Sequence, residues 1–166
     1  MPRHTWGMTN IHHLHLPAAT YFFTVRVQQR GSTLLTDHIE SLRYAYAKAV
    51  QEFPVTCHAM VILPDHLHAV WTEPDGGVFY TERWRRIKTR FAQAIPATSN
   101  EKGIWQRRFI EHAIRTRDDF QRAVQHCAQN PVWHGLTTVA EAWPYSSFAK
   151  GKAADQAPAR RTLVSA

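Results

Sequence analysis

The sequence is poor in cysteine and contains no long hydrophobic run. Two cysteines in 166 residues cannot form a disulfide framework, and Cys57 and Cys127 both lie in apolar stretches, so we expect two buried free thiols. No apolar run approaches the ~18 residues that a membrane-spanning helix needs. The first residues also lack the apolar core of a signal peptide. These absences favour a cytoplasmic protein.

Acidic residues are scarce relative to basic ones. The chain has 13 Asp and Glu against 20 Lys and Arg, which gives a formal net charge of +7, and its 11 His add positive charge when they are protonated. Such a balance indicates a polyanionic partner, with nucleic acid ahead of a membrane surface and of a small-molecule substrate. The length and the 44% hydrophobic content are typical of one domain with a real core.

Hydrophobic periodicity predicts the order strand, helix, strand, strand, helix, strand, helix. The expected ranges are 21–28, 36–53, 56–63, 66–72, 81–95, 105–114 and a last helix that Asp118 or Asp119 caps and Pro131 ends. The first six elements match the split βαββαβ arrangement of ferredoxin-like α+β folds, with an antiparallel sheet and two helices on one face. We expect residues 1–20 to form a leader, 21–149 the domain and 150–166 a basic, disordered tail.

One strand carries a candidate metal pair. Because residues i and i+2 of a strand point the same way, His66 and His68 present two imidazoles on one face. Two imidazoles suit a divalent metal, which still needs a third protein ligand. The spacing alone is weak in a chain with 11 His, and His13 and His15 repeat it in an irregular segment.

Several short segments together resemble a known family. Residues 63–71, LPDHLHAVW, resemble the metal strand of the single-tyrosine HUH endonucleases. The segments WQRRF at 105–109, NPV at 130–132, HG at 134–135 and WPYSS at 143–147 follow in the order and spacing of the REP-associated tyrosine transposases. The resemblance covers about residues 21–148.

The resemblance implies a ferredoxin-like fold, with a C-terminal helix that carries site residues, and binding of single-stranded or hairpin DNA from repetitive extragenic palindromes. It implies that His66, His68 and Asn130 hold Mg²⁺ or Mn²⁺, which polarises the scissile phosphate. A family tyrosine then cleaves and rejoins the strand through a 5′-phosphotyrosine link. We expect a monomer or a weak dimer.

The chain departs from the family at the nucleophile. The tyrosine position, four residues before Asn130, is occupied by His126. Three interpretations follow. The protein binds DNA without cleaving it, or it cleaves DNA with His126 as a covalent nucleophile or with a displaced Tyr80 or Tyr145. In the third, His126 is a substitution introduced at the tyrosine position, or the alignment with the family is shifted by one helical turn. If His126 instead joins His66 and His68 as a ligand, three imidazoles favour Zn²⁺.

Arginines and tryptophans supply candidate DNA contacts. Guanidinium groups fork onto phosphates, and indoles stack on unpaired bases. The candidate arginines are Arg83, Arg86, Arg90, Arg107, Arg108, Arg115 and Arg122, although a row such as 83–90 is equally typical of a solvated helix face. Trp6, Trp105 and Trp133 are stacking candidates, whereas Trp84 fits the core stripe of its helix. Glu111 is either a partner of a metal-bound histidine or a sheet-surface acid.

Overall fold

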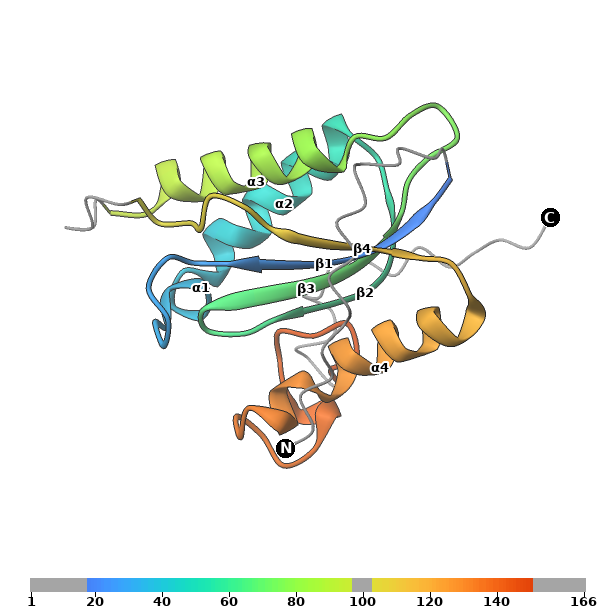
Figure 1. The fold of residues 1–166 in the computed structure, drawn as a ribbon. Coiled ribbons are helices and arrows are strands. Elements are labelled where there is room, and N and C mark those ends of the chain that lie inside the picture. Colours follow the sequence, from blue (N-terminus) through green and yellow to red (C-terminus); the bar gives the residue numbers. More distant parts are fainter. Residues whose placement is uncertain (1–17, 97–102, 151–166) are drawn as a thin grey trace.

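Four antiparallel strands form the middle layer of the molecule (Figure 1), in a computed structural model that describes residues 18–96 and 103–150. The strands are β1 (Thr20–Arg26), β2 (Thr56–Ile62), β3 (His66–Thr72) and β4 (Ile110–Ile114). They lie in the order β2-β3-β1-β4, and each neighbouring pair is antiparallel. The leader predicted for residues 1–20 lies almost wholly outside the described residues, and so does the tail after Lys150.

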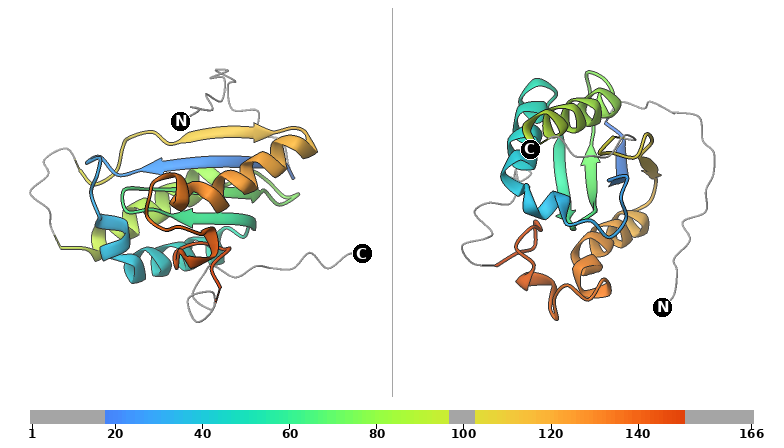
Figure 2. Two further views of the ribbon diagram at one scale, coloured as in Figure 1. Left: turned by 90° about the horizontal axis from the view of Figure 1, so that it is seen from below. Right: turned by 90° about the vertical axis from the view of Figure 1, so that its left-hand side faces the viewer.

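Helices cover both faces of this sheet (Figure 2). α2 (Ile39–Glu52) and α3 (Tyr80–Ala94) form the layer on one face, here called the helix layer. α4 (Arg117–Trp133) crosses the other, here called the site face. The short α1 (Leu34–Asp37) and the 3₁₀ turn η1 (Ala140–Ala142) complete the structure. The predicted α+β class with its βαββαβ order is therefore confirmed. None of the helices described in these two ranges is long and apolar enough to cross a membrane.

Period-two alternation places a core on each side of the sheet. Tyr21 and Phe23 of β1 join the larger core under the helix layer, where the Trp71 and Trp84 rings stack with centroids 4.2 Å apart. Phe22, one residue away on β1, faces the opposite way and joins a smaller core under α4. Because both faces are buried, every side chain of β3 except the last is buried, the two histidines included.

The end of α4 differs from the prediction. Pro131 was expected to stop the helix, yet α4 runs to Trp133. Pro131 removes only its own main-chain donor, in the last turn. Gly135, with φ of 69°, then closes the helix, since the N–H of Gly135 donates to the Val132 carbonyl and the N–H of Leu136 to the Pro131 carbonyl. At the other end the cap is Thr116, whose hydroxyl accepts from the Asp119 N–H, and neither predicted aspartate caps the helix.

Two other predicted elements are shorter or broken. The helix expected at 36–53 is interrupted at His38, where φ of −115° ends α1 before α2 begins. The strand expected from Trp105 begins at Ile110. Trp105 makes a single bridge to Val27, and its indole N–H donates to the Lys88 carbonyl of α3, which holds it away from the ladder.

The segment after α4 returns to cover the edge of β2. The Trp143 indole donates to the Ile62 carbonyl at 2.8 Å, and the Ile62 N–H donates to the Tyr145 carbonyl at 2.8 Å. The Ser147 N–H donates to the Met60 carbonyl, and its hydroxyl accepts from the Met60 N–H. These bonds satisfy main-chain groups that an edge strand otherwise leaves open.

A buried ion pair joins α3 to the end of β3. Arg83 and Glu73 are both fully buried, with Nη1 and Oε1 2.8 Å apart. The remaining guanidinium donors bond the Phe53 and Pro54 carbonyls, and Glu73 Oε2 accepts from the Phe79 N–H. The pair is fully hydrogen-bonded, so removal of one partner would leave an uncompensated buried charge.

We therefore expect Arg83→Met to lower the free energy of unfolding by about 3 to 5 kcal/mol in urea denaturation, because Glu73 is left buried and unpaired. The matched control is Arg85→Ala on the exposed side of α3, which should cost no more than about 1 kcal/mol. Adding Glu73→Leu to Arg83→Met should cost less than the sum of the two single changes. A loss below about 1 kcal/mol for Arg83→Met would contradict this account.

Candidate metal centre on the site face

His66 and His68 lie side by side on the site face of β3. Each is 3% exposed, and their ring centroids are 5.1 Å apart with the rings nearly perpendicular. In the β1–β3 register Thr24 lies opposite His68 and Arg26 opposite His66, and side chains directly opposite each other share a face. The strand spacing therefore does what the sequence predicts and adds a hydroxyl and a cation beside the two imidazoles.

Hydrogen bonds fix the orientation of both rings. The Asp65 carboxylate accepts from His66 Nδ1 at 2.6 Å, and the Gly31 N–H holds the second carboxylate oxygen at 2.8 Å. Thr24 Oγ1 lies 2.8 Å from His68 Nδ1. With Nδ1 of each ring engaged, Nε2 is the atom that each ring can offer to a metal, and a carboxylate behind a ligating histidine is a common support.

The surroundings keep both imidazoles neutral. Burial lowers the pKa of His66, although its bond to Asp65 acts the other way. Burial lowers the pKa of His68 well below its usual value, and the nearby His126, His66 and Arg26 add to that shift. For Asp65, burial alone would raise the pKa, but the bonds from His66 and Gly31 lower it overall. A neutral imidazole has the lone pair that a metal needs.

Helix α4 brings Asn130 and His126 onto the same site. The His126 ring lies 4.8 Å from the His68 ring and edge-on to it, and Asn130 is 3% exposed. Asn130 Nδ2 lies 3.0 Å from His126 Nε2. Because an amide nitrogen only donates, Nε2 is the acceptor and a neutral His126 carries its proton on Nδ1. His126 thus fixes which end of the amide is left for other partners.

Among the residues that the structure describes, two buried acceptors at this site have no hydrogen-bond partner: His66 Nε2 and Asn130 Oδ1. A buried polar atom without a partner costs about 1 to 3 kcal/mol, so it needs a reason. As metal ligands, imidazole nitrogen and amide oxygen both suit Mn²⁺, and Mg²⁺ binds the amide oxygen readily. The residues present therefore fit the predicted ligand set of His66, His68 and Asn130.

The three-imidazole alternative finds no support. Within 18–96 and 103–150, no group of three or more His, Cys, Asp or Glu is placed to hold a metal ion. His126 Nε2 is already hydrogen-bonded to Asn130. The candidate set therefore depends on the Asn130 amide, and the predicted Zn²⁺ site is disfavoured.

None of the five tyrosines of the chain, all of which fall within the described residues, replaces the missing nucleophile on the site face. Tyr21, Tyr46, Tyr80 and Tyr145 belong to the core under the helix layer or pack against it, and Tyr44 lies exposed on α2. Burial and a hydrogen bond to Glu111 raise the pKa of Tyr80. The predicted substitutes Tyr80 and Tyr145 are therefore on the wrong side of the sheet.

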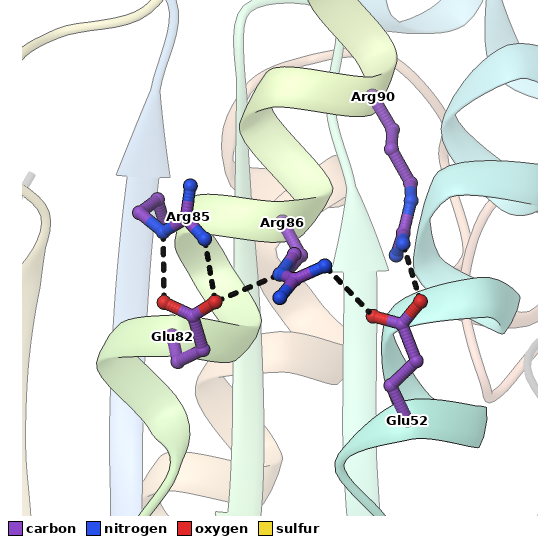
Figure 3. A network of polar contacts seen from close by, with 5 residues as sticks. All are labelled: Glu52, Glu82, Arg85, Arg86 and Arg90. Carbon is purple, nitrogen blue, oxygen red and sulfur yellow. Dashed lines mark hydrogen bonds and ion pairs between the residues drawn. The ribbon is translucent and has the colours of Figure 1, made fainter.

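The arginines of α3 are also on that side. The prediction that Arg83 binds DNA fails, because its guanidinium is fully buried against Glu73. Arg86 donates to Glu82 at 2.7 Å and lies 3.7 Å from Glu52 of α2, while Arg90 pairs with Glu52 (Figure 3). Arg85 pairs with Glu82, and the bonds from Arg85 and Arg86 lower the pKa of Glu82 to about 2.

This network joins α2 to α3 and neutralises much of the positive charge of the row. Both helices lie on the face of the sheet opposite α4 (Figure 1), whereas His66 and His68 face α4. The structure therefore does not bring Arg86 and Arg90 to the candidate metal centre.

Four predicted arginines remain exposed near β4 and α4. Arg107 and Arg108 precede β4, Arg115 follows it, and Arg122 lies on α4. Arg122 pairs with Asp119. These side chains stay candidates for DNA contact.

Sequence reasoning missed the groups that support the histidines. The sequence pattern does not predict a role for Arg26, Asp65 or Thr24, and it does not place His134, whose ring lies 5.1 Å from that of His66. Asp65 directly precedes the pair, and Arg26 and Thr24 alternate on the adjacent predicted strand, but strand register is needed to place them. Glu111 was offered as a support and is opposite Phe23, so it faces the helix layer.

No family model matches the chain. It is 39% identical over 141 residues to a REP-associated tyrosine transposase of Escherichia coli (strain K12), across 85% of this chain and 83% of the relative. It is 38% identical over 138 residues to a putative REP-associated tyrosine transposase of Haemophilus influenzae, across 77% of this chain and 78% of the relative.

A solved structure of a REP-associated tyrosine transposase bound to a REP hairpin is also similar. The TM-score is 0.77 at 39% identity, with 85% of this chain and 83% of that chain covered. The agreement extends over most of the described fold.

If the two unpaired acceptors serve a metal, Mn²⁺ at about 100 times its Kd should raise the free energy of unfolding by about 2.7 kcal/mol, since it binds the folded state. Asn130→Leu should abolish this Mn²⁺-dependent shift in thermal or urea denaturation. His38→Ala, remote from the site between α1 and α2, should keep it. An unchanged shift in Asn130→Leu would remove the amide from the ligand set.

Proposed function

The chain belongs to the REP-associated tyrosine transposase family, and from this premise we propose that it binds single-stranded and hairpin DNA of repetitive extragenic palindromes. A family structure that holds a REP hairpin supports the proposal. The observation that carries it in this chain is the buried pair of unpaired acceptors, His66 Nε2 and Asn130 Oδ1, on the site face. The net charge of +7 suits a polyanion.

In this proposal His66, His68 and Asn130 hold Mg²⁺ or Mn²⁺. The bound metal would polarise a DNA phosphate and neutralise part of its charge. The protein's own part is to orient the ligands: Asp65 holds the His66 ring, Thr24 the His68 ring and His126 the Asn130 amide. In this division of roles His126 acts only through the Asn130 amide, and none of the three ligands, here called the metal cradle, attacks the phosphate.

The geometry of His126 favours binding without cleavage. A nucleophile needs a lone pair directed at the phosphorus, and the His126 Nε2 lone pair accepts from the Asn130 amide. None of the five tyrosines, all of them described, lies on the site face: four belong to the helix-layer core or pack against it, and Tyr44 is exposed on α2. We therefore assign His126 a positioning role, in place of the catalytic role that its alignment with the family tyrosine predicts.

The second candidate function is cleavage with His126 as the nucleophile. It is supported by the contact between the rings of His126 and His68. An imidazole nitrogen would attack the phosphorus, the bond to the 3′ oxygen would break, and that oxygen would leave as a hydroxyl after gaining a proton. The product would be a 5′-phosphohistidine. This route requires Nε2 to release the Asn130 amide, or the other ring nitrogen to turn toward the phosphate.

Arginines near the site supply the contacts to the DNA backbone. Arg26 lies opposite His66 in the register of β1 and β3, and its charge contributes to the lowered pKa of both histidines. The exposed Arg107, Arg108, Arg115 and Arg122 extend the positive surface along β4 and the start of α4. Arg–phosphate contacts of this kind position a strand without reading its sequence.

The test is to mix the protein, Mn²⁺ and a labelled hairpin oligonucleotide with a single-stranded extension. Binding in a mobility-shift assay without a covalent adduct on a denaturing gel is the expected result. His126→Tyr should produce an adduct, because a nucleophile is then restored and the tyrosine hydroxyl can still accept the hydrogen bond from the Asn130 amide. The control is His126→Phe, which should produce none.

Each alternative has its own signature in this assay. An adduct with the wild-type protein that is labile in acid and stable in alkali identifies a phosphohistidine and favours the second candidate. Failure of the wild-type protein to shift the hairpin at low salt contradicts the proposed function itself.

Arg26→Gln should weaken hairpin binding and reduce the slope of log Kd against log salt by about 1, because one phosphate contact is lost. Fluorescence anisotropy at several salt concentrations measures both. Arg85→Gln, on the helix layer and paired with Glu82, should leave the slope unchanged. An equal effect of the two changes would mean that Arg26 acts through net charge alone.

A further inference from the structure

Exposed apolar side chains gather at the C-terminal end of α4. Large hydrophobic residues that remain exposed in the described structure include Trp133 at 45%, Leu136 at 38% and Val139 at 53%, all within seven positions of the sequence. An exposed indole is costly to leave in water, and such patches usually mark a binding surface. Trp133 lies in the last turn of α4, which also carries Asn130.

Trp133 is the end of a row of rings that runs into the candidate metal centre. Its ring lies 5.3 Å from that of His126 at an interplanar angle of 74°. The row continues to His68 at 4.8 Å, to His66 at 5.1 Å and to His134 at 5.1 Å. Each contact is edge-to-face, so Trp133 is fixed relative to the ligands while much of its surface stays open.

The position of the row restricts what can cover Trp133. Trp133 contacts His126, which contacts His68, so a base beside a phosphate held at the two histidines is a group of the right kind to cover the indole. The cationic Arg26 beside the histidines and the charge of +7 select a polyanion over an apolar peptide. Stacking on an aromatic face suits any base, because every base has a π face.

We propose that Trp133 stacks on an unpaired DNA base next to the phosphate held at the site face. The proposal rests on the proposed function and adds the residue that favours a single-stranded extension over a blunt hairpin. A base pair inside the duplex cannot take this place, since both its faces are covered by its neighbours.

The experiment compares two hairpins that differ only in a single-stranded extension, with fluorescence anisotropy in Mn²⁺ at fixed salt. Trp133→Ala should raise the Kd for the extended hairpin about tenfold and leave the Kd for the blunt hairpin within about twofold. Trp133→Phe should stay close to the wild type for both. Tyr44→Ala is the matched control, because Tyr44 is 61% exposed but lies on the helix layer, and it should change neither Kd.

A second measurement locates the base. With 2-aminopurine placed at each position of the extension in turn, one position should show fluorescence quenching on binding that Trp133→Ala removes. Uniform quenching that Trp133→Ala leaves unchanged would overturn the proposal.

The remaining outcomes are distinct from one another. Equal weakening of both hairpins by Trp133→Ala would make Trp133 a general contact and overturn the stacking role. A sedimentation coefficient that falls in Trp133→Ala without DNA would show that a second copy of the chain covers the indole. If the wild-type protein binds neither hairpin, the proposed function fails and the stacking role fails with it, whereas loss of the Trp133 effect alone leaves the proposed function intact.

Discussion

The burial of both faces of one sheet is the constraint on which the site depends. Strand β3 lies between the helix layer and α4, so each of its alternating side chains enters one core or the other. Leu67, Ala69 and Trp71 stabilise the helix-layer core, and His66 and His68 must then lie under α4. A one-residue slip of register would exchange the two sets and place the histidines in the larger core, which is why the register is strongly fixed.

Burial of the site also lowers the stability of the isolated protein. Water would stabilise His66 Nε2 and Asn130 Oδ1, but the packing around α4 leaves both without a partner in the described structure. Asp65 and Thr24 bond the Nδ1 atoms of His66 and His68, and His126 bonds the Asn130 Nδ2. The Nε2 atoms of the two rings and the Asn130 Oδ1 are not used by these bonds. The protein thus accepts a local cost in stability that a bound cation can offset, a pattern typical of binding sites built before the ligand arrives.

Sequence pattern was sufficient for what depends on local period and insufficient for what depends on register and charge pairing. Alternation located β1 and β3 and put His66 and His68 on one face. It could not tell that Arg83 of α3 turns inward, because Glu73, ten positions earlier, becomes its partner only after folding. Pro131 was misjudged for a similar reason: its effect depends on the closing bonds at Gly135, which lie beyond it in the chain.

Helix α4 carries both residues that the proposed function distinguishes. The Asn130 amide and the His126 ring are four residues apart on one face of α4, so a change at position 126 leaves the helix, its cap and its closing turn in place. In the proposed function, the affinity for DNA depends on phosphate contacts and on the metal cradle, in which His126 takes part only through its hydrogen bond to the Asn130 amide. Because the imidazole at 126 can still hold the amide by a hydrogen bond, a change that removes the attacking group need not disturb binding. In the proposed function, binding and cleavage are therefore separable at a single side chain.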